Sequence, residues 1–462
     1  MTELEITEAI NYDRFEKFEP ENLTCKCLVH FRPYSEWKGV GYGFDWMRLE
    51  DYMPQIFKDA AWDSANKGDT SYKKIVSRHY VKGAIGTIER DGNEEYGEYV
   101  FDQKLFDKLK NWYGYHKVQW KIIGQTESGS PITDEYYCSW LTIYPKKSAL
   151  LSLIIDVDEI PEKLEFDFDP NLFTVSPKVI AGSSLKLGDN LLKDFLTVTC
   201  NNEFKGGDRN EKPINVFAYK EGEEEGQLAG QLFVWENYSA KLKTAKVILV
   251  EVKLTANKPA SQFPTAEDLA IDVQTPAEDV FNQAYLSLGS NYILPLPLLD
   301  DLMFKPGGHY MTRGGDIIGY YQNTQSPPNR KDILDYLIEK FNSQYPGNIY
   351  DRYVKAFVFQ EDGGKYQNGY FKRIGGYSNG KSNDIIIYKG KAPEVVAHEV
   401  LHSLGLPHSF TDSQADTRAL FTYHNKLTNN IMDYSSPGAR YTLWLWQSQI
   451  VNNKLDRDGY VK

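Results

Sequence analysis

Three histidines, a glutamate and a glycine stand at fixed spacing in the segment HEVLHSLGLPH, residues 398–408. Histidines four residues apart on a helix share one face, so the imidazoles of His398 and His402 can reach the same ion. Such a pair suits a tetrahedral Zn²⁺, with Zn–N distances of about 2.0–2.1 Å, and His408 would be the third ligand. The spacing therefore predicts one zinc ion per chain, with its fourth position open to water.

Glu399 and Gly405 complete the pattern HExxHxxGxxH. A carboxylate directly after the first ligand can hold the attacking water and take its proton, so Glu399 is the predicted general base. Gly405 follows the expected helix, where an abrupt reversal often needs a positive φ, which glycine adopts without steric cost. A buried helix whose histidines only form hydrogen bonds would explain an isolated HxxxH, but not all these residue types at these offsets.

A methionine follows further along, as Met432 in the segment NNIMDYSS, residues 429–436. Together with the histidine motif, this pattern resembles the metzincin zinc peptidases, in which a methionine turn lies beneath the metal. The segments LGLPHSF (404–410) and NIMDY (430–434) are most similar to the pappalysin and cytophagalysin group. The resemblance covers about residues 265–462 and implies a zinc endopeptidase. It also implies that Tyr434 ligates zinc or donates a hydrogen bond to the oxygen that becomes negative during the reaction.

Relatives in this group often carry calcium as well. Asp362, Asp412 and Asp416 are the candidate ligands in this chain. They do not form the alternating ligand loop of a known calcium motif. The sequence therefore supports zinc and gives no support to Ca²⁺.

The predicted ligands need a helix and a neighbouring strand to position them. Residues 393–404 have the signals of a buried helix, because Pro393 suits a first turn and Glu394 favours the positive helix end. A strand is expected just before it, after glycine turns at 375–380. In metzincins an antiparallel edge strand at this place binds extended substrate by main-chain pairing. We therefore expect a substrate-binding edge strand formed by Asp384, Ile385, Ile386, Ile387 and Tyr388.

The rest of this part of the chain has the pattern of a mixed sheet covered by helices. Apolar residues recur at helical spacing in 329–341, which predicts an amphipathic helix packed on a sheet. Residues 353–359 read as a strand. Residues 443–451 fit a closing helix after the methionine turn.

Changes in hydrophobic period and the positions of proline and glycine divide the chain into three predicted domains. Residues 1–158 mix strands with a helix at 105–112 and predict an N-terminal α+β or β-rich module. Residues 159–254 contain closely spaced short strands, as in an immunoglobulin-like β-sandwich. A proline-containing linker begins the zinc peptidase domain at 255–462. The chain is thus predicted to be multidomain α+β, with a metzincin-like domain at its C-terminal end.

Composition excludes several function classes. Hydrophobic residues make up 41% of the 462 positions and aromatic residues 14%, which is typical of a folded protein. Acidic residues outnumber basic ones by 64 to 52, so a nucleic-acid or anionic-membrane partner is not expected. No apolar run approaches the roughly 18 residues of a membrane-spanning helix. The four cysteines are scattered and are predicted to be reduced structural thiols.

The expected partner is a polypeptide or peptide substrate, and two alternatives remain open. The segments FRPY (31–34) and GYGFDWMR (41–48), with Trp37, resemble leading segments of proteins linked to bacterial type VI secretion. One alternative is therefore a delivered toxin that cuts peptidoglycan peptides or one target protein. The other is a non-catalytic adhesion or binding protein with structural zinc.

Residues 1–10 show no secretory leader. The sequence therefore predicts synthesis in a bacterial cytoplasm and action after export by a non-classical route. In that interpretation residues 1–254 would contact a secretion apparatus or a cell surface.

Overall fold

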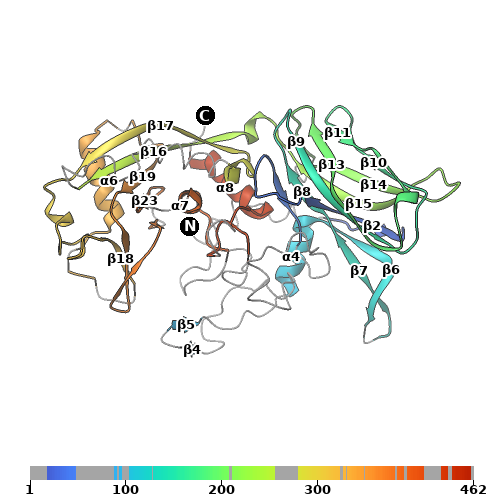
Figure 1. Ribbon diagram of the computed structural model, residues 1–462, viewed down its shortest axis with the longest axis horizontal. Coiled ribbons are helices and arrows are strands. Elements are labelled where there is room, and N and C mark those ends of the chain that lie inside the picture. The colour runs from blue at the N-terminus through green and yellow to red at the C-terminus, as the bar shows by residue number, and fades with distance from the viewer. Residues whose placement is uncertain are drawn as a thin grey trace. The chain divides into compact units, whose positions relative to one another are not determined.

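The computed structural model describes residues 18–47, 88–90, 93–95, 103–126, 128–207, 211–254, 279–322, 326–328, 330–347, 349–379, 382–389, 393–409, 428–434 and 440–458. The chain divides into two compact units, whose elements are labelled in Figure 1. Unit 1 comprises Met1–Leu242, Asn282–Tyr285 and His408–Gln449. Unit 2 comprises Lys243–Phe281, Leu286–Pro407 and Ile450–Lys462.

Unit 1 is built on two sheets that share one hydrophobic core. The six-stranded sheet has the order β12-β10-β14-β15-β8-β3, and the four-stranded sheet has the order β11-β13-β9-β2. Leu164 of β10 and Leu153 of β9 are fully buried members of the same core. The strands of the first sheet are β3 (Gly43–Asp45), β8 (Ser139–Thr142), β10 (Lys163–Asp167), β12 (Val179–Ala181), β14 (Glu211–Tyr219) and β15 (Gln227–Trp235). Those of the second are β2 (Cys27–Pro33), β9 (Ser148–Val157), β11 (Phe173–Ser176) and β13 (Gly188–Cys200).

Smaller elements complete unit 1. Helix α4 (Gln103–Tyr113) contains the helix predicted at 105–112, which is confirmed. The remaining elements are β1 (Asn22–Leu23), β4 (Ile88–Arg90), β5 (Asn93–Glu95), β6 (Tyr115–Gln125), β7 (Pro131–Tyr137), and the 3-10 turns η4 (Gly182–Ser184) and η5 (Ser239–Lys241).

The sheets of unit 1 do not follow the predicted boundary at residue 158. Strand β2 pairs with β9, and β9 pairs with β13, so one sheet joins strands from both sides of that boundary. Such pairing depends on contacts between segments far apart in sequence, which a local hydrophobic pattern does not encode. The sandwich therefore includes strands that we had assigned to an N-terminal module.

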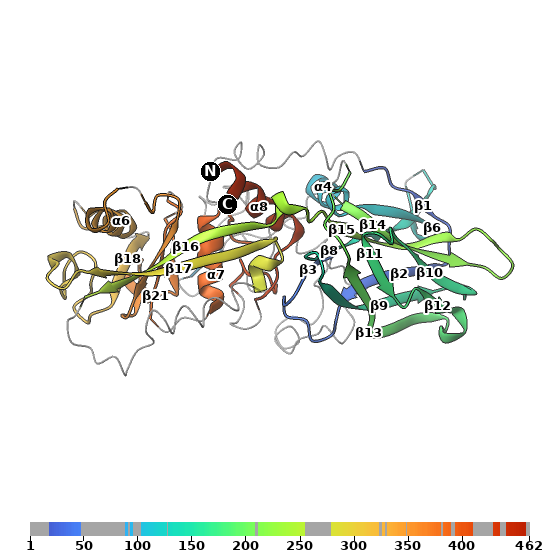
Figure 2. The same ribbon diagram turned by 90° about the horizontal axis from the view of Figure 1, so that it is seen from above.

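Unit 2 contains a five-stranded mixed sheet in the order β17-β16-β19-β23-β22. All its neighbouring pairs are parallel except β22 with β23, which is antiparallel. Figure 2 shows β16 and β17 side by side along much of their length. The strands are β16 (Lys243–Lys253), β17 (Leu286–Pro297), β19 (Val354–Phe359), β22 (Gly376–Tyr377) and β23 (Ile385–Ile387).

Strand β16 corrects a second boundary, since its residues 247–252 were predicted to belong to the sandwich. Val247, Ile248, Leu249 and Val250 are all at most 5% exposed. A run buried on both faces is typical of an inner strand of a parallel sheet, because both of its surfaces are covered. The five-stranded sheet of unit 2 thus begins at Lys243 and not after the predicted linker at 255.

Helix α6 (Ile333–Gln344) packs on this sheet as predicted, but it begins later than expected from the pattern at 329–341. Its first turn is capped by Asp332, whose carboxylate accepts a hydrogen bond from the Leu334 N–H at 2.9 Å. Leu337 and Phe341 of α6 share a buried core with Phe357 of β19. The amphipathic pattern therefore predicted the face of α6 that packs on the sheet, whereas the Asp332 cap determines the residue at which the helix begins.

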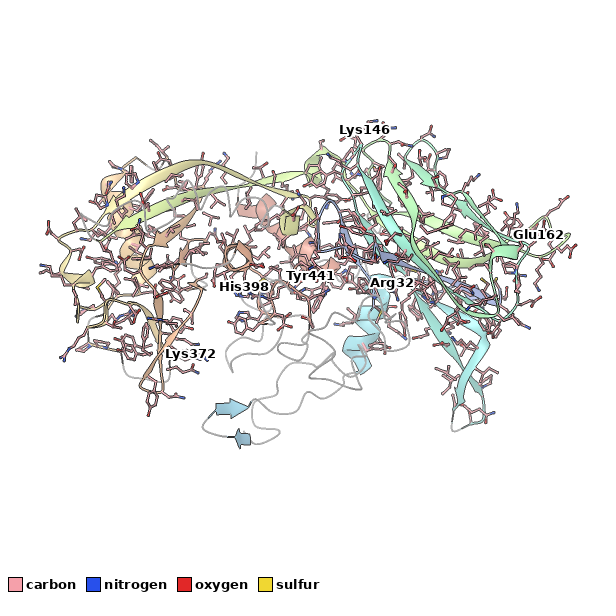
Figure 3. The ribbon with its side chains drawn as sticks, viewed as in Figure 1. Arg32, Lys146, Glu162, Lys372, His398 and Tyr441 are labelled. Carbon is pink, nitrogen blue, oxygen red and sulfur yellow. The ribbon has the colours of Figure 1, made fainter. Side chains whose placement is uncertain are left out.

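A second, three-stranded sheet in unit 2 has the order β18-β20-β21. Figure 3 marks Lys372 on its hairpin and His398 on α7. Its strands are β18 (Ile317–Gln322), β20 (Gly363–Gln367) and β21 (Tyr370–Arg373). The other elements of unit 2 are η7 (Leu302–Phe304) and α7 (Pro393–Ser403), whereas α8 (Leu445–Asp458) has residues in both units.

Two further expectations concern the chain as a whole. Among the residues with described positions, no helix is long and apolar enough to cross a membrane. All four cysteines are buried thiols that form no disulfide. Burial raises the pKa of Cys25 to about 11, so this thiol stays protonated near neutral pH and is a poor metal ligand.

Candidate metal centre

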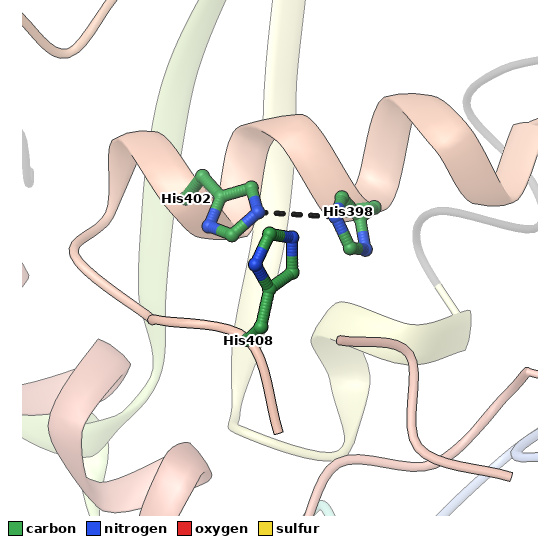
Figure 4. A group of neighbouring side chains, drawn as sticks. All are labelled: His398, His402 and His408. Carbon is green, nitrogen blue, oxygen red and sulfur yellow. Dashed lines mark hydrogen bonds between the residues drawn. The ribbon is translucent and has the colours of Figure 1, made fainter. Parts of the chain in front are cut away.

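Helix α7 carries His398 and His402 on the same face, as the four-residue spacing predicts. Their ring centroids are 4.6 Å apart, and their Nε2 atoms are 3.0 Å apart. Figure 4 shows the two imidazoles with His408 beside them. The pair therefore directs two ring nitrogens toward one small region.

The protonation of His402 is fixed by the backbone that follows the helix. Its Nδ1 lies 2.7 Å from the carbonyl oxygen of Leu406. Because a carbonyl oxygen can only accept a hydrogen bond, Nδ1 must be the donor, and neutral His402 then has a lone pair on Nε2. Metal-ligating histidines characteristically donate their second ring N–H in this way. His402 is thus held in the tautomer that a metal ligand requires.

Gly405 ends α7 as predicted, with φ at +92°. The Gly405 N–H donates to the His402 carbonyl oxygen at 2.9 Å, and the Leu406 N–H donates to the Leu401 carbonyl oxygen at 3.0 Å. These two bonds define a Schellman motif, which needs a left-handed residue at the glycine position. The same reversal places the Leu406 carbonyl against His402, so one turn both ends the helix and sets the tautomer.

The ligand atoms of His398, His402 and His408 all lie within 4.8 Å of one another. His398 is 4% exposed and His408 is 9% exposed, so both have lost most of their contact with water. Tetrahedral zinc with bonds of about 2.0–2.1 Å would set its nitrogen ligands roughly 3.3 Å apart. The separations therefore need to shrink by at most about 1.5 Å to fit a zinc ion, and neutral imidazoles are suitable donors.

Glu399, the predicted general base, lies on α7 between the two histidines and is 8% exposed. It lies directly against strand β22. A Cβ atom added to Gly376 would be 2.5 Å from Glu399 Cγ and 2.9 Å from both Cδ and Oε1. The missing side chain at Gly376 therefore provides the space for this carboxylate, and the sequence analysis had assigned that glycine only to a turn.

Met432 and Tyr434 lie in a tightly hydrogen-bonded turn. Met432 is fully buried, and its carbonyl oxygen accepts a hydrogen bond from the N–H of Ser409, the residue after His408, at 3.2 Å. The ring of Tyr434 lies 4.8 Å from that of His408, and the side chain is 46% exposed. The turn is thus joined to the third histidine by main chain and by ring contact.

A buried amide pair fixes this turn, and the sequence analysis did not identify it. Asn430 donates to Gln447 Oε1 at 2.6 Å, and the Gln447 amide donates back to Asn430 Oδ1 at 3.1 Å. Asn430 Oδ1 also accepts the Met432 N–H at 2.9 Å. Both side chains are fully buried, so each bond satisfies a group that has no contact with water. The segment NNIMDY showed where the turn lies, but gave no signal for its partner in α8.

The predicted substrate-binding strand, Asp384 to Tyr388, is not an edge strand. Strand β23 pairs with β19 on one side and with β22 on the other. Ile385, Ile386, Ile387 and Tyr388 are at most 3% exposed. The antiparallel edge is instead β22, because Gly376 and Tyr377 pair with β23 although their sequence reads as a turn. The prediction placed the edge one strand too far inward.

Asp384 has a structural role that yields a stability prediction. It accepts the Lys355 N–H at 2.8 Å, and its Oδ1 lies 3.7 Å from Lys355 Nζ, with both side chains less than 9% exposed. Removing one partner of a buried pair leaves an uncompensated charge, so Asp384→Ala should lower the unfolding free energy by about 3 kcal/mol. The double variant Asp384→Ala/Lys355→Met should recover the part of that loss that comes from the unpaired lysine charge, as measured in denaturant titrations. A stability unchanged in Asp384→Ala would contradict this role.

The calcium candidates do not form a described site. Asp412 and Asp416 lie outside the described residues. Asp362 Oδ2 lies 3.7 Å from Arg373 Nη2, an ion pair that occupies this carboxylate without a metal. Among the described residues, the histidine cluster is the group that could hold a metal ion.

Comparison with known proteins adds no family assignment. The chain matches no protein-family model, and a search of the curated proteins finds no significant match.

Proposed function

We propose that this protein is a zinc endopeptidase whose metal ligands are His398, His402 and His408. The observation that carries the proposal is the state of His402. Its Nδ1 proton is donated to the Leu406 carbonyl oxygen, and its Nε2 faces His398 Nε2 at 3.0 Å. At this distance the two nitrogens share either a proton, in a hydrogen bond, or a cation, and the ligand atoms of all three histidines lie within 4.8 Å of one another. A cation at this position satisfies all three.

Zinc bound there would polarise the scissile carbonyl group and lower the pKa of the attacking water. Glu399 would accept the proton of that water and pass it to the leaving amine. The small exposed fraction of Glu399, 8%, keeps competing bulk water away from this carboxylate. Tyr434, which is half exposed beside His408, would donate its O–H to the carbonyl oxygen as negative charge develops.

The finer proposal is a metzincin-type peptidase domain. It is supported by the histidine motif on α7, the mixed sheet with one antiparallel edge strand, and the buried Met432 in its hydrogen-bonded turn. The two-sheet sandwich of unit 1 supports the proposal of an immunoglobulin-like module. The peptidase identity rests also on the sequence resemblance, and the immunoglobulin-like identity on the closely spaced short strands of residues 159–254.

The test is cleavage of a peptide library, read by mass spectrometry, with the purified full-length chain. We expect cleavage within peptides, loss of cleavage on addition of a zinc chelator, and recovery on addition of zinc. A chain that binds one zinc ion and cleaves nothing would contradict the proposal and favour a metal that only supports the fold. Cleavage of purified peptidoglycan but not of the library would contradict a general endopeptidase and favour the delivered toxin.

A further inference from the structure

Asp332 joins helix α6 to the edge strand β22 through its two carboxylate oxygens. Oδ1 accepts the Leu334 N–H at 2.9 Å and so caps the helix. Oδ2 accepts the Tyr377 O–H at 2.6 Å, and Tyr377 is one of the two residues of β22. A capping residue needs only one of these bonds, so the second fixes the strand to the helix.

The loop after β22 is held at the same point. The Asn379 side-chain N–H₂ group donates to Oδ1 of Asp332 and to Oδ1 of Asp335, both at 3.3 Å. Asn379 Oδ1 accepts the Ser382 N–H at 3.1 Å. The helix N-terminus therefore holds the strand and the loop that leads on to β23.

The ring of Tyr377 is also fixed. It stacks on Tyr320 of β18 with centroids 4.9 Å apart and planes at 23°. Burial, reinforced by the Asp332 charge, raises the pKa of Tyr377, so the phenol remains a hydrogen-bond donor throughout the neutral range. The phenol can therefore donate to Asp332 across the neutral pH range.

This clamp bears directly on the proposed catalytic base. Gly376 precedes Tyr377, and its position against Glu399 leaves no room for even one methyl group. One side of β22 pairs with β23, and β22 is the last strand in the order of its sheet. Among the described residues no other strand pairs with β22, so its second side is a main-chain edge, and Gly376 places this strand next to the carboxylate. The placement of the edge depends on the side chain of Tyr377.

We infer that Asp332 and Tyr377 are positioning residues that hold the β22 edge in register for an extended peptide beside Glu399. The inference rests on the proposed function, because the peptide is the substrate proposed above. Neither residue touches the reacting atoms. Their effect is to keep a two-residue strand, which is too short to be rigid by itself, at a fixed place relative to helix α7.

The test uses Tyr377→Phe, which removes the O–H and keeps the ring that stacks on Tyr320. We expect the amide hydrogens of residues 375–379 to exchange faster in the metal-free protein, as measured by mass spectrometry. We also expect the affinity of a fluorescent library-derived peptide for the zinc-loaded Glu399→Gln protein to fall about five- to tenfold when Tyr377→Phe is added. In the active enzyme KM should rise by a similar factor, while kcat changes less than twofold.

Tyr336→Phe is the matched control. Tyr336 donates its O–H to Asp301 at 2.7 Å, and Asp301 also caps a helical turn in unit 2, through the Met303 N–H. Tyr336→Phe loses a tyrosine–carboxylate hydrogen bond that does not involve β22. It should therefore leave the amide hydrogen exchange of residues 375–379 and the peptide affinity unchanged. Asp332→Ser retains a cap but is too short to reach Tyr377, so it should reproduce Tyr377→Phe. Asp332→Asn keeps the capping oxygen, and its amide N–H can donate to the Tyr377 oxygen in place of the lost acceptor, so it should retain more affinity than Asp332→Ser.

Unchanged exchange at 375–379 in Tyr377→Phe would overturn the clamp. Equal losses in Tyr377→Phe and Tyr336→Phe would also overturn it, since they would show a general loss of stability. Faster exchange in a chain that neither binds nor cleaves any peptide would mean that the proposed function fails and that the peptide role of the clamp fails with it. The exchange readout therefore separates the two failures.

Discussion

Glu399→Gln is expected to lower kcat/KM for peptide cleavage by about 10²- to 10⁴-fold while one zinc ion stays bound. Glutamine has nearly the shape of glutamate, so the nearly buried side chain can keep its place on α7 beside Gly376. The amide cannot accept the proton of the attacking water, so only the chemical step is lost. Peptide kinetics together with elemental analysis of the purified protein measure both quantities.

Glu394→Gln provides the control for this variant. Glu394 lies in the first turn of the same helix, so Glu394→Gln makes the same chemical change outside the ligand segment. It should keep both zinc and activity. Full activity in Glu399→Gln would rule out this residue as the base, and loss of zinc would assign it a role in holding the metal.

Gly376→Ala is the second variant with a large expected effect. The added methyl group would lie 2.5 Å from Glu399 Cγ, closer than carbon atoms approach each other in proteins, so either β22 or the carboxylate must move. A displacement of about 1 Å at a catalytic group can lower the rate by about 10²-fold. We expect a loss of that size in kcat/KM, with unchanged zinc content and a stability loss of about 1–3 kcal/mol.

Gly314→Ala is the control for Gly376→Ala. Gly314 lies in unit 2, and an added Cβ there would have Thr312 Oγ1 as its nearest neighbour at 3.7 Å, which is an ordinary contact. Its activity and stability should match those of the wild type. If Gly376→Ala were as active as Gly314→Ala, β22 would have room to move without disturbing Glu399, and the account of this side of the site would be wrong.

The sequence predicted the parts of the site that depend on local chain geometry. The face shared by His398 and His402 follows from the helical repeat, and the positive φ of Gly405 follows from the need to end the helix. The cap at Asp332 had a local signal too, because an aspartate directly before the first apolar residue of a helix is a common N-cap. That signal was overlooked in favour of the longer pattern at 329–341.

The features that were missed depend on distant contacts. Strand β22 has two residues and a glycine-rich sequence, so it is a strand only because β23 offers its main chain. Strand β9 lies in the sandwich because β2 and β13 pair with it on either side. The partnership of Asn430 with Gln447 likewise joins a turn to a helix further along the chain. No hydrophobic period reports such pairings, whereas sheet register and buried polar networks depend on them.

Zinc K-edge X-ray absorption spectroscopy of the purified full-length protein tests the central claim most directly. The account predicts one zinc ion with three imidazole nitrogens and one oxygen donor at about 2.0–2.1 Å, and no sulfur ligand. This signal should be lost or strongly weakened in His402→Ala and kept in Glu399→Gln. A zinc–sulfur distance near 2.3 Å, or an unchanged spectrum in His402→Ala, would show that the metal is held elsewhere and would contradict the account.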